Sequence, residues 1–187
     1  GLIDVPDENG ETRAQGPAAG RAVDLFSPES QEIERMNIGN SVVKGVIPTK
    51  SGEAIISDDF AERFSVNIGD EVTLFGSTMN GSMMFHNFIV SGTIRFGPAM
   101  LDRGAIIIDI TDAQMILDME DAASEVLGYF KDGLYDTEKA GLISDSFNEK
   151  YSNVNDEFSP QMFKLEEDAG LDEYLMLADS MSGVMIT

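Results

Sequence analysis

The chain has 187 residues, of which 42% are hydrophobic and 25% are charged, a composition typical of one folded domain or two small ones. Its formal net charge of −22 repels nucleic-acid phosphates and anionic lipid headgroups, so we expect the domain to bind no nucleic acid and no lipid surface directly. The absence of cysteine and the single histidine, His86, exclude disulfides, cysteine nucleophiles and thiolate or His-rich metal sites, and no cofactor is expected.

The first 64 residues contain signals for two extended segments, two helices and a strand. Residues 1–26 are predicted to form a hairpin with its turn at residues 6–10, followed by an extended segment, because Asn and Gly in the turn tolerate positive φ. A short helix is expected from Ser27, which is a good N-cap followed by proline. A buried strand over residues 52–56 and a second helix capped by Ser57 come next.

Gly69 and Asp70 lie between the second helix and an apolar run at residues 72–75. Asp70, beside Glu71, is either a catalytic or metal-binding carboxylate or a residue that turns the chain. Glycine permits a left-handed backbone, and an aspartate can accept hydrogen bonds from neighbouring amides in a turn. Catalysis would need a second acid across a cleft, which the local pattern does not supply. The sequence therefore predicts a structural turn at Gly69 and Asp70.

A polar, glycine-rich loop at residues 76–84 separates this strand from another at residues 85–94. Asn80-Gly81 is a strong signal for the tip of a hairpin. The loop also carries Met79, Met83 and Met84. These methionines either fold back on the sheet or form an adaptable apolar contact surface, and residue type leaves both interpretations open.

Residues 105–108 are typical of a buried strand, and Thr111 to Gln114 match a capping box that opens a helix. Nearby acids, including Asp109 and Asp112, could suggest a cation site. At a helix start and on a solvated face acids need no metal, so the structural interpretation is favoured.

The pattern changes after residue 124. We expect a β-α-β unit over residues 124–158, with strands at 125–130 and 154–158 flanking a helix at 137–151. From Leu171 apolar residues follow helical spacing to the end, a pattern that could continue into a membrane. No stretch is apolar for long enough to span a bilayer. Both ends of the sequence look cut, and we expect it to be a fragment of a longer chain.

Several motifs, taken in order, resemble one known family. Residues 52–75 read GEAIISDDFAERFSVNIGDEVTLF, residues 88–117 read FIVSGTIRFGPAMLDRGAIIIDITDAQMIL with an acid at Asp102, and GLIDV with GRAVDLFSP precedes them. This order of motifs resembles the MacB-like periplasmic core domain of FtsX-like ABC transporter permeases. In that domain a strand and a helix are followed by a GD-x-V-x-L motif, an F-x-V-x-G strand and a helix with D-A-Q. That family includes macrolide-exporter and lipoprotein-releasing types.

The resemblance implies an α+β fold in two parts. Residues 1–123 would be the β-rich inserted subdomain of a permease ectodomain. Residues 124–187 would be the β-α-β half of a porter-like subdomain and a helix leading to a transmembrane segment. The family has a strand–helix unit before the inserted subdomain, and on this resemblance we expect the sequence to begin after that unit.

The resemblance also implies a function without enzymatic activity in this domain. The ectodomain would couple cytoplasmic ATP hydrolysis to export or lipoprotein release, by mechanical motion and partner contact. No Walker motif is present, so the ATPase would be a separate cytoplasmic subunit. The other partners implied are a periplasmic adaptor or carrier protein and a second permease chain. The domain would be extracytoplasmic at the cell membrane, and periplasmic where an outer membrane exists.

In lipoprotein-releasing relatives a hairpin in this lobe hooks the carrier, and residues 76–86 occupy the matching place. The residues expected in the partner contact are Met79, Asn80, Gly81, Met83, Met84 and His86. The alternative function is a free-standing secreted acidic binding module. A hydrolase using carboxylates is a third candidate, disfavoured because no acid pair, nucleophile or metal cluster is evident.

Overall fold

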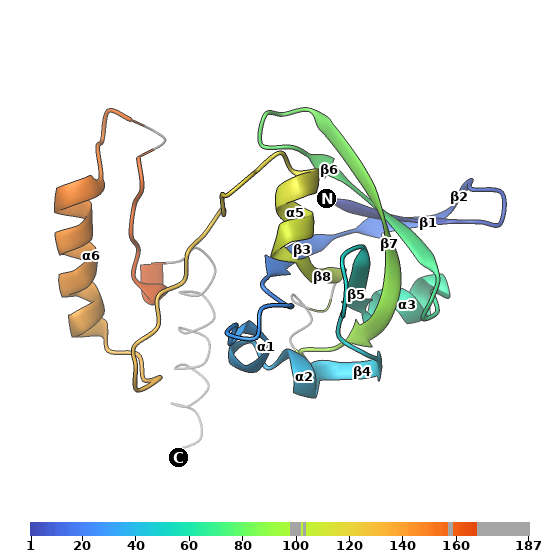
Figure 1. Ribbon diagram of the computed structural model, residues 1–187, viewed down its shortest axis with the longest axis horizontal. Coiled ribbons are helices and arrows are strands. Elements are labelled where there is room, and N and C mark those ends of the chain that lie inside the picture. The colour runs from blue at the N-terminus through green and yellow to red at the C-terminus, as the bar shows by residue number, and fades with distance from the viewer. Residues whose placement is uncertain (98–101, 103, 157–158, 168–187) are drawn as a thin grey trace, which may run out of the picture. The chain divides into compact units, whose positions relative to one another are not determined.

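The computed structural model describes residues 1–97, 102, 104–156 and 159–167 (Figure 1). The chain divides into two compact units, residues 1–125 and 126–187. The predicted division at residue 123 lies close to this boundary, but what the two parts are in family terms stays a prediction. The described residues combine helices with a mixed sheet, and the predicted α+β class is confirmed.

The first unit contains all the strands of the described chain and four short helices. The strands are β1 (Leu2–Pro6), β2 (Thr12–Pro17), β3 (Ala19–Val23), β4 (Val42–Gly45), β5 (Glu53–Ser57), β6 (Glu71–Ser77), β7 (Met83–Ile94) and β8 (Ala105–Asp109). The helices are α1 (Glu32–Arg35), α2 (Ile38–Ser41), α3 (Asp58–Phe64) and α5 (Ile110–Ile116). The second unit contains α6 (Thr137–Tyr151) and the 3-10 turn η1 (Leu165–Glu167).

The eight strands form one sheet in the order β2-β1-β6-β7-β5-β8-β3, with β4 added beside β7. β3 pairs with β8 and β5 with β7 in parallel, and the other pairs are antiparallel. β2 and β3, the two ends of this order, follow each other in the chain with only Ala18 between them. The Ala18 amide donates to the carbonyl of Gly1 at 2.9 Å. The sheet therefore curls so that its two end strands join at Ala18.

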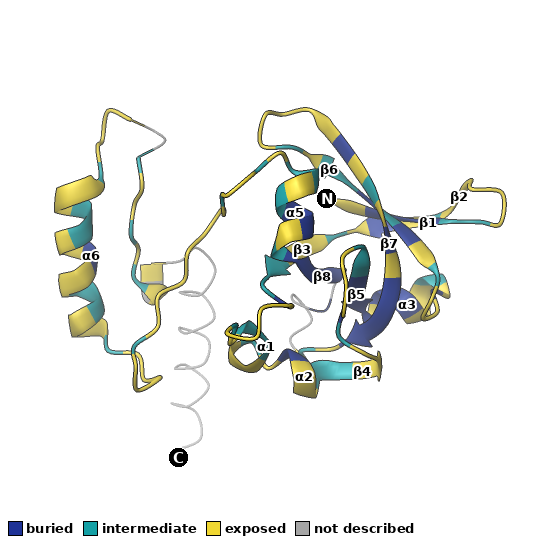
Figure 2. Cartoon of the chain, in the orientation of Figure 1, coloured by how far each residue is buried: buried dark blue, intermediate teal, exposed yellow. Residues whose placement is uncertain are grey.

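Strand alternation sends side chains to two apolar clusters (Figure 2). The larger cluster lies inside the curled sheet and contains residues from β1, β5, β6, β7 and β8 together with α3 and α5. The smaller cluster lies on the other face of β5 and β8, where Ile55 and Ile107 are register partners and Ile38 of α2 is fully buried. Burying an isoleucine contributes about 1.5–3 kcal/mol, so both clusters stabilise the first unit.

Two of the four described helices in the first unit, α3 and α5, start at a short polar side chain that caps them. Ser57 caps α3 as predicted, since its hydroxyl accepts from the Phe60 amide at 3.2 Å. The predicted cap at Thr111 is wrong. Asp109 caps α5 instead, and its carboxylate accepts from the Thr111 amide at 2.9 Å. The Thr111 amide, which a capping box would pair with the Gln114 side chain, is thus satisfied by an aspartate two residues earlier.

The first helix also begins later than predicted. Ser27 lies in a turn, because its amide donates to Asp24 at 2.9 Å and its carbonyl accepts from Ser30 at 3.1 Å. α1 therefore starts at Glu32. The Asp24 side chain thus accepts a hydrogen bond from the amide of Ser27, the residue predicted to cap the helix.

The predicted β-α-β unit in the second part is wrong at its first strand. The helix is present as α6, capped by Asp136, but residues 125–130 are described and form no strand. Val126 is 91% exposed, and no neighbouring strand in the described residues pairs with this segment. β-rich composition produces a strand only where a partner supplies hydrogen bonds.

Other predictions for this part are only partly covered by the described chain. Residues 154–156 form no strand, while residues 157 and 158 of the same prediction, and the helix expected from Leu171, lie outside the described residues. Within the described residues, no helix combines the length and the apolarity that crossing a membrane requires.

Candidate contact surface

The turn between α3 and β6 has the geometry expected of Gly69 and Asp70. Gly69 adopts φ of 93°, a value that side chains disfavour, and its amide donates to the Val90 carbonyl at 2.8 Å. The Asp70 carboxylate accepts from the Asn67 amide at 2.8 Å. Both residues hold the chain reversal that starts β6, and Asp70 accepts from its own turn rather than facing a second acid.

The hairpin of β6 and β7 carries the residues expected to contact a partner. Asn80 and Gly81 lie at its tip, where Gly81 has φ of 78°. Met79 and Met83 are exposed, Met83 by 84%. His86 is half-buried, and its ring lies edge-on to Phe88 at 4.9 Å between centroids.

Met84 does not belong with the exposed methionines. It is only 7% exposed and belongs to the large core cluster. The reason is strand alternation: Met83 and Met84 are consecutive residues of β7, so their side chains lie on opposite faces. The hypothesis that Met79, Met83 and Met84 together form a contact surface is therefore wrong for Met84.

Sequence reasoning missed an apolar row on the solvent face of the sheet. Register pairing places Pro17, Leu2, Phe75 and Phe85 side by side across β2, β1, β6 and β7, and these four residues are named the apolar row. Phe85 is 71% exposed and Leu2 43%. The rings of Phe75 and Phe85 lie 6.3 Å apart, within the range of aromatic contact. The alternation of buried and exposed residues along β7 was the signal that could have revealed this row.

A second row runs beside the first. It contains Gln15, Asp4, Thr73 and Asn87, and is named the polar row. Ile3 and Val5 of β1 lie in the core cluster. Leu2 and Asp4 alternate with them along the strand, so their side chains point to the opposite, outer face of the sheet. The two rows are therefore neighbours on one surface, which continues to the exposed Met83.

A cluster of charges lies elsewhere in the unit, around Asp58 at the start of α3. Its fully buried carboxylate accepts from Thr93 Oγ1 at 2.7 Å and Arg95 Nη2 at 2.9 Å, and pairs with Lys44 Nζ at 3.2 Å. Burial raises the pKa of Asp58, but the hydrogen bonds from Thr93 and Lys44 and the charges of Lys44 and Arg95 outweigh it. The pKa of Asp58 therefore lies below its ordinary value.

The cations of this cluster are shared with other acids. The pKa of Lys44 is raised by its hydrogen bond to Asp58, and that of Arg95 by its hydrogen bond to Asp59. Lys44 also pairs with Glu62 at 3.4 Å. A cleft of about 440 Å³ lies beside them and is lined in part by Lys44, Glu62 and Thr93. With three acids around two cations, the cluster joins α3 to β4 and β7 and leaves no unbalanced positive charge to bind an anion.

Two other buried acids, Asp102 and Asp112, are also engaged with the protein. Asp102 accepts from the amides of Phe96 and Gly97 at 2.7 and 2.9 Å. Asp112 accepts from Ser51 Oγ at 2.5 Å and the Gly52 amide at 2.9 Å. Within the described residues, no group of three or more His, Asp or Glu side chains is placed to hold a metal ion.

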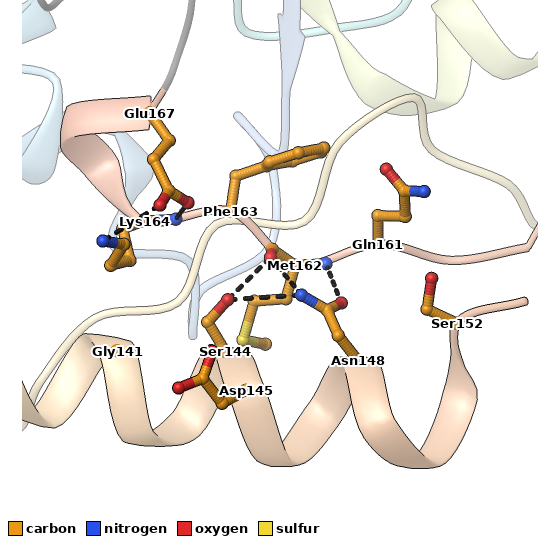
Figure 3. A pocket seen from close by; sticks show the side chains of 10 residues that line it. All are labelled: Gly141, Ser144, Asp145, Asn148, Ser152, Gln161, Met162, Phe163, Lys164 and Glu167. Atoms are coloured by element: carbon orange, nitrogen blue, oxygen red, sulfur yellow. Dashed lines mark hydrogen bonds and ion pairs between the residues drawn. The ribbon is translucent and has the colours of Figure 1, made fainter. Parts of the chain in front are cut away.

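The second unit contains a hollow of about 410 Å³ beside α6 (Figure 3). The Asn148 side chain donates to the Met162 carbonyl and accepts from the Met162 amide, both at 2.8 Å, and Ser144 Oγ donates to the same carbonyl at 2.8 Å. Lys164 and Glu167 form an ion pair of 2.9 Å at one end. These bonds hold residues 161–164 against the helix, so the polar groups at the centre of the hollow are used structurally.

No protein-family model matches this sequence, and no curated protein matches it.

Proposed function

We propose that this chain is the extracytoplasmic domain of an FtsX-like ABC transporter permease, which couples cytoplasmic ATP hydrolysis to export or lipoprotein release through contact with a partner protein. The observation that carries the proposal is the apolar row with Met83, on the solvent face of the β6–β7 hairpin. A surface of adjacent exposed aromatic and methionine side chains suits protein contact, because burying it on binding is favourable. The order of motifs in residues 1–117 supplies the family.

The use of the carboxylates supports a contact function rather than catalysis. Four of the five buried aspartates among the described residues accept hydrogen bonds or pair with cations within the fold. They are Asp58, Asp102, Asp109 and Asp112. A general acid or base needs to face a substrate rather than a backbone amide.

The first test locates the protein and its ATPase. The full-length protein would be tagged in its native cells, and membranes and culture medium would be separated. We expect the protein in membranes, cleavable by protease added from outside, and an ATP-hydrolysing subunit that copurifies with it. Protein found free in the medium with no ATPase would contradict the proposal and favour the secreted acidic binding module.

The second test removes the apolar surface. We expect Met83→Ser combined with Phe85→Ser to reduce export at least about tenfold, since exposed aromatic anchors commonly carry binding energy, while the ATPase still copurifies. The matched control is Val46→Ser combined with Ile68→Ser, which removes two exposed apolar side chains elsewhere in the unit. Equal effects of the two pairs would contradict a specific contact at the hairpin.

A further inference from the structure

Asp4 differs from every other buried aspartate of the described chain. It is 6% exposed, and its buried Oδ1 has no hydrogen-bond partner. A buried carboxylate oxygen without a partner costs about 1–3 kcal/mol or more, so such groups are rare and each one needs an explanation.

The neighbours of Asp4 explain why its carboxylate is not satisfied from within. Thr73 lies opposite Asp4 in register, but a threonine has one hydroxyl proton, and Thr73 Oγ1 donates it to Asn87 Oδ1 at 2.9 Å. The Asn87 amide in turn donates to Glu71 Oε1 at 2.8 Å. Thr73 and Asn87 thus direct these donors away from Asp4 and toward Glu71.

The apolar row lies beside this carboxylate. Leu2 and Asp4 are two residues apart on β1, so their side chains share the outer face about 7 Å apart. The same holds for Thr73 and Phe75 on β6. A ligand that covers Phe85 and Leu2 therefore also covers Asp4. Beside the aromatic and aliphatic side chains it meets one carboxylate, whose Oδ1 has no hydrogen-bond donor within the fold.

Charge complementarity defines the occupant. The two rows contain no lysine or arginine, and the chain as a whole has 34 acidic against 12 basic residues. Another acidic surface, including a second copy of this chain, would be repelled. A lysine or arginine supplies the donors that Asp4 lacks, and its aliphatic stem suits the adjacent apolar row.

We propose that the two rows form a docking surface for a partner-protein segment that carries a lysine or arginine beside apolar side chains, with the basic group bound at Asp4. This inference specifies the partner chemistry of the contact in the proposed function and rests on that function for its biological setting. The segment would lie across β1, β6 and β7, with apolar side chains on Leu2, Phe75 and Phe85.

The test is site-specific photo-crosslinking in native cells. A benzoylphenylalanine would replace Phe85 in one strain, Leu2 in a second and Val46, as the control, in a third, and mass spectrometry would identify the crosslinked peptide. We expect positions 2 and 85 to capture the same partner segment, which has a lysine or arginine within a few residues of the crosslink. A segment without a basic residue, a second copy of this chain, or no capture above that at position 46 would overturn the proposal.

The role of Asp4 itself is tested with an isosteric variant. We expect Asp4→Asn to lower the crosslinking yield from position 85 at least fivefold, while Glu29→Gln, which removes an exposed acid outside the surface, leaves it unchanged. Wild-type yield should also fall as salt rises from about 0.05 to 0.5 M, because salt screens the long-range attraction between a basic segment and this acidic chain. An unchanged yield in Asp4→Asn would overturn the assignment of Asp4.

A measurement on the free protein separates binding from folding. Asp4→Asn should melt at the same temperature as wild type or higher, because the variant relieves an unpaired buried charge. A lower melting temperature would show that Asp4 serves the fold and would refute the inference. If a basic segment is captured but no ATPase copurifies, the permease function alone is refuted. If an ATPase copurifies but no basic segment is captured, the docking surface alone is refuted.

Discussion

The two units of the chain differ in what their apolar side chains contact. In the first unit two clusters bury whole strands. In the second unit Ser144 is the one buried residue among residues 126–156, 159–165 and 167. Val154 in the second unit is 95% exposed. An isolated 15-residue helix is marginal in water, and α6 is held to its described neighbours chiefly by polar bonds to Met162. The first unit therefore has the contacts of an independent domain, and the described residues of the second do not.

The chain contains a spectroscopic probe for this comparison. It has no tryptophan, and all four tyrosines, at positions 129, 135, 151 and 174, lie in the second unit. Tyrosine fluorescence thus reports on the second unit, while the sheet signal in circular dichroism reports on the first. If the two units are independent, the two signals follow separate unfolding transitions.

The largest expected effect comes from the core of the first unit. Phe88 is fully buried in the large cluster, and Phe88→Ala should destabilise this unit by about 3–5 kcal/mol through lost burial and the cavity left behind. Urea unfolding followed by circular dichroism would measure the loss. The tyrosine transition should stay where it is, and a parallel shift of both signals would contradict the independence of the units.

The Asp58 cluster should give the next largest effect. Asp58→Asn leaves the hydroxyl of Thr93 and two cations without their carboxylate, and we expect a loss of about 2 kcal/mol at neutral pH, moderated because both cations are partly exposed. Chemical denaturation at pH 7 would measure it. Lys44→Met, which removes one cation and keeps its aliphatic stem, should cost less. A variant as stable as wild type would contradict this account.

The same cluster predicts a pH dependence. The pKa of Asp58 is lower in the folded protein than its ordinary value of 3.8, so its contribution to stability is present above that value and is lost as pH falls below it. The stability difference between wild type and Asp58→Asn should therefore narrow as pH decreases below about 4. Denaturation of both proteins between pH 7 and pH 3 would show it, and a constant difference would refute the assignment.

Asn148 offers a smaller, local test in the second unit. Asn148→Ala removes both side-chain bonds to Met162 and should release residues 161–164 at a local cost of about 1–2 kcal/mol. Hydrogen exchange at the Met162 amide would detect it. Asn153→Ala, in an exposed turn, is the control. Faster exchange in the first unit would show that the units are coupled.

The smallest expected change in stability comes from oxidation of the exposed methionines. Dilute hydrogen peroxide should convert Met83 to its sulfoxide before Met84, because the first is exposed and the second lies in the core. The change in unfolding free energy should be within about 0.5 kcal/mol, as expected for an exposed site. Peptide mass spectrometry would follow the order, and equal rates at Met83 and Met84 would contradict the burial of Met84.

Local signals in the sequence predicted much of the first unit. The hairpin tip at Asn80-Gly81, the cap at Ser57 and the turn at Gly69 depend on nearby residues, and the structure has all three. The errors arise where a neighbouring aspartate competes for the same backbone amide. Asp109 takes the capping role from Thr111, and Asp24 holds Ser27 in a turn.

The candidate surface could be predicted only in part. Alternation along β7 separates Met83 from Met84, but the apolar row depends on the register of β2, β1, β6 and β7, which joins residues up to 73 positions apart. The strand expected at residues 125–130 failed for a related reason, since composition cannot show whether a pairing strand exists.

The meeting of β2 and β3 at the two ends of the sheet has a consequence for the order of folding. β1 and β2 pair locally, but β1 also needs β6, and β3 needs β8 from residues 105–109. Pairings so distant in sequence have a large entropic cost and slow the search for the native state. During synthesis the first hairpin, which ends at Pro17, therefore emerges early and waits for about 60 more residues, until its partner β6 is complete at Ser77. Until Asp109 has left the ribosome the sheet cannot close, and a chaperone that shields the unpaired edges of β1 and β3 would act in that interval.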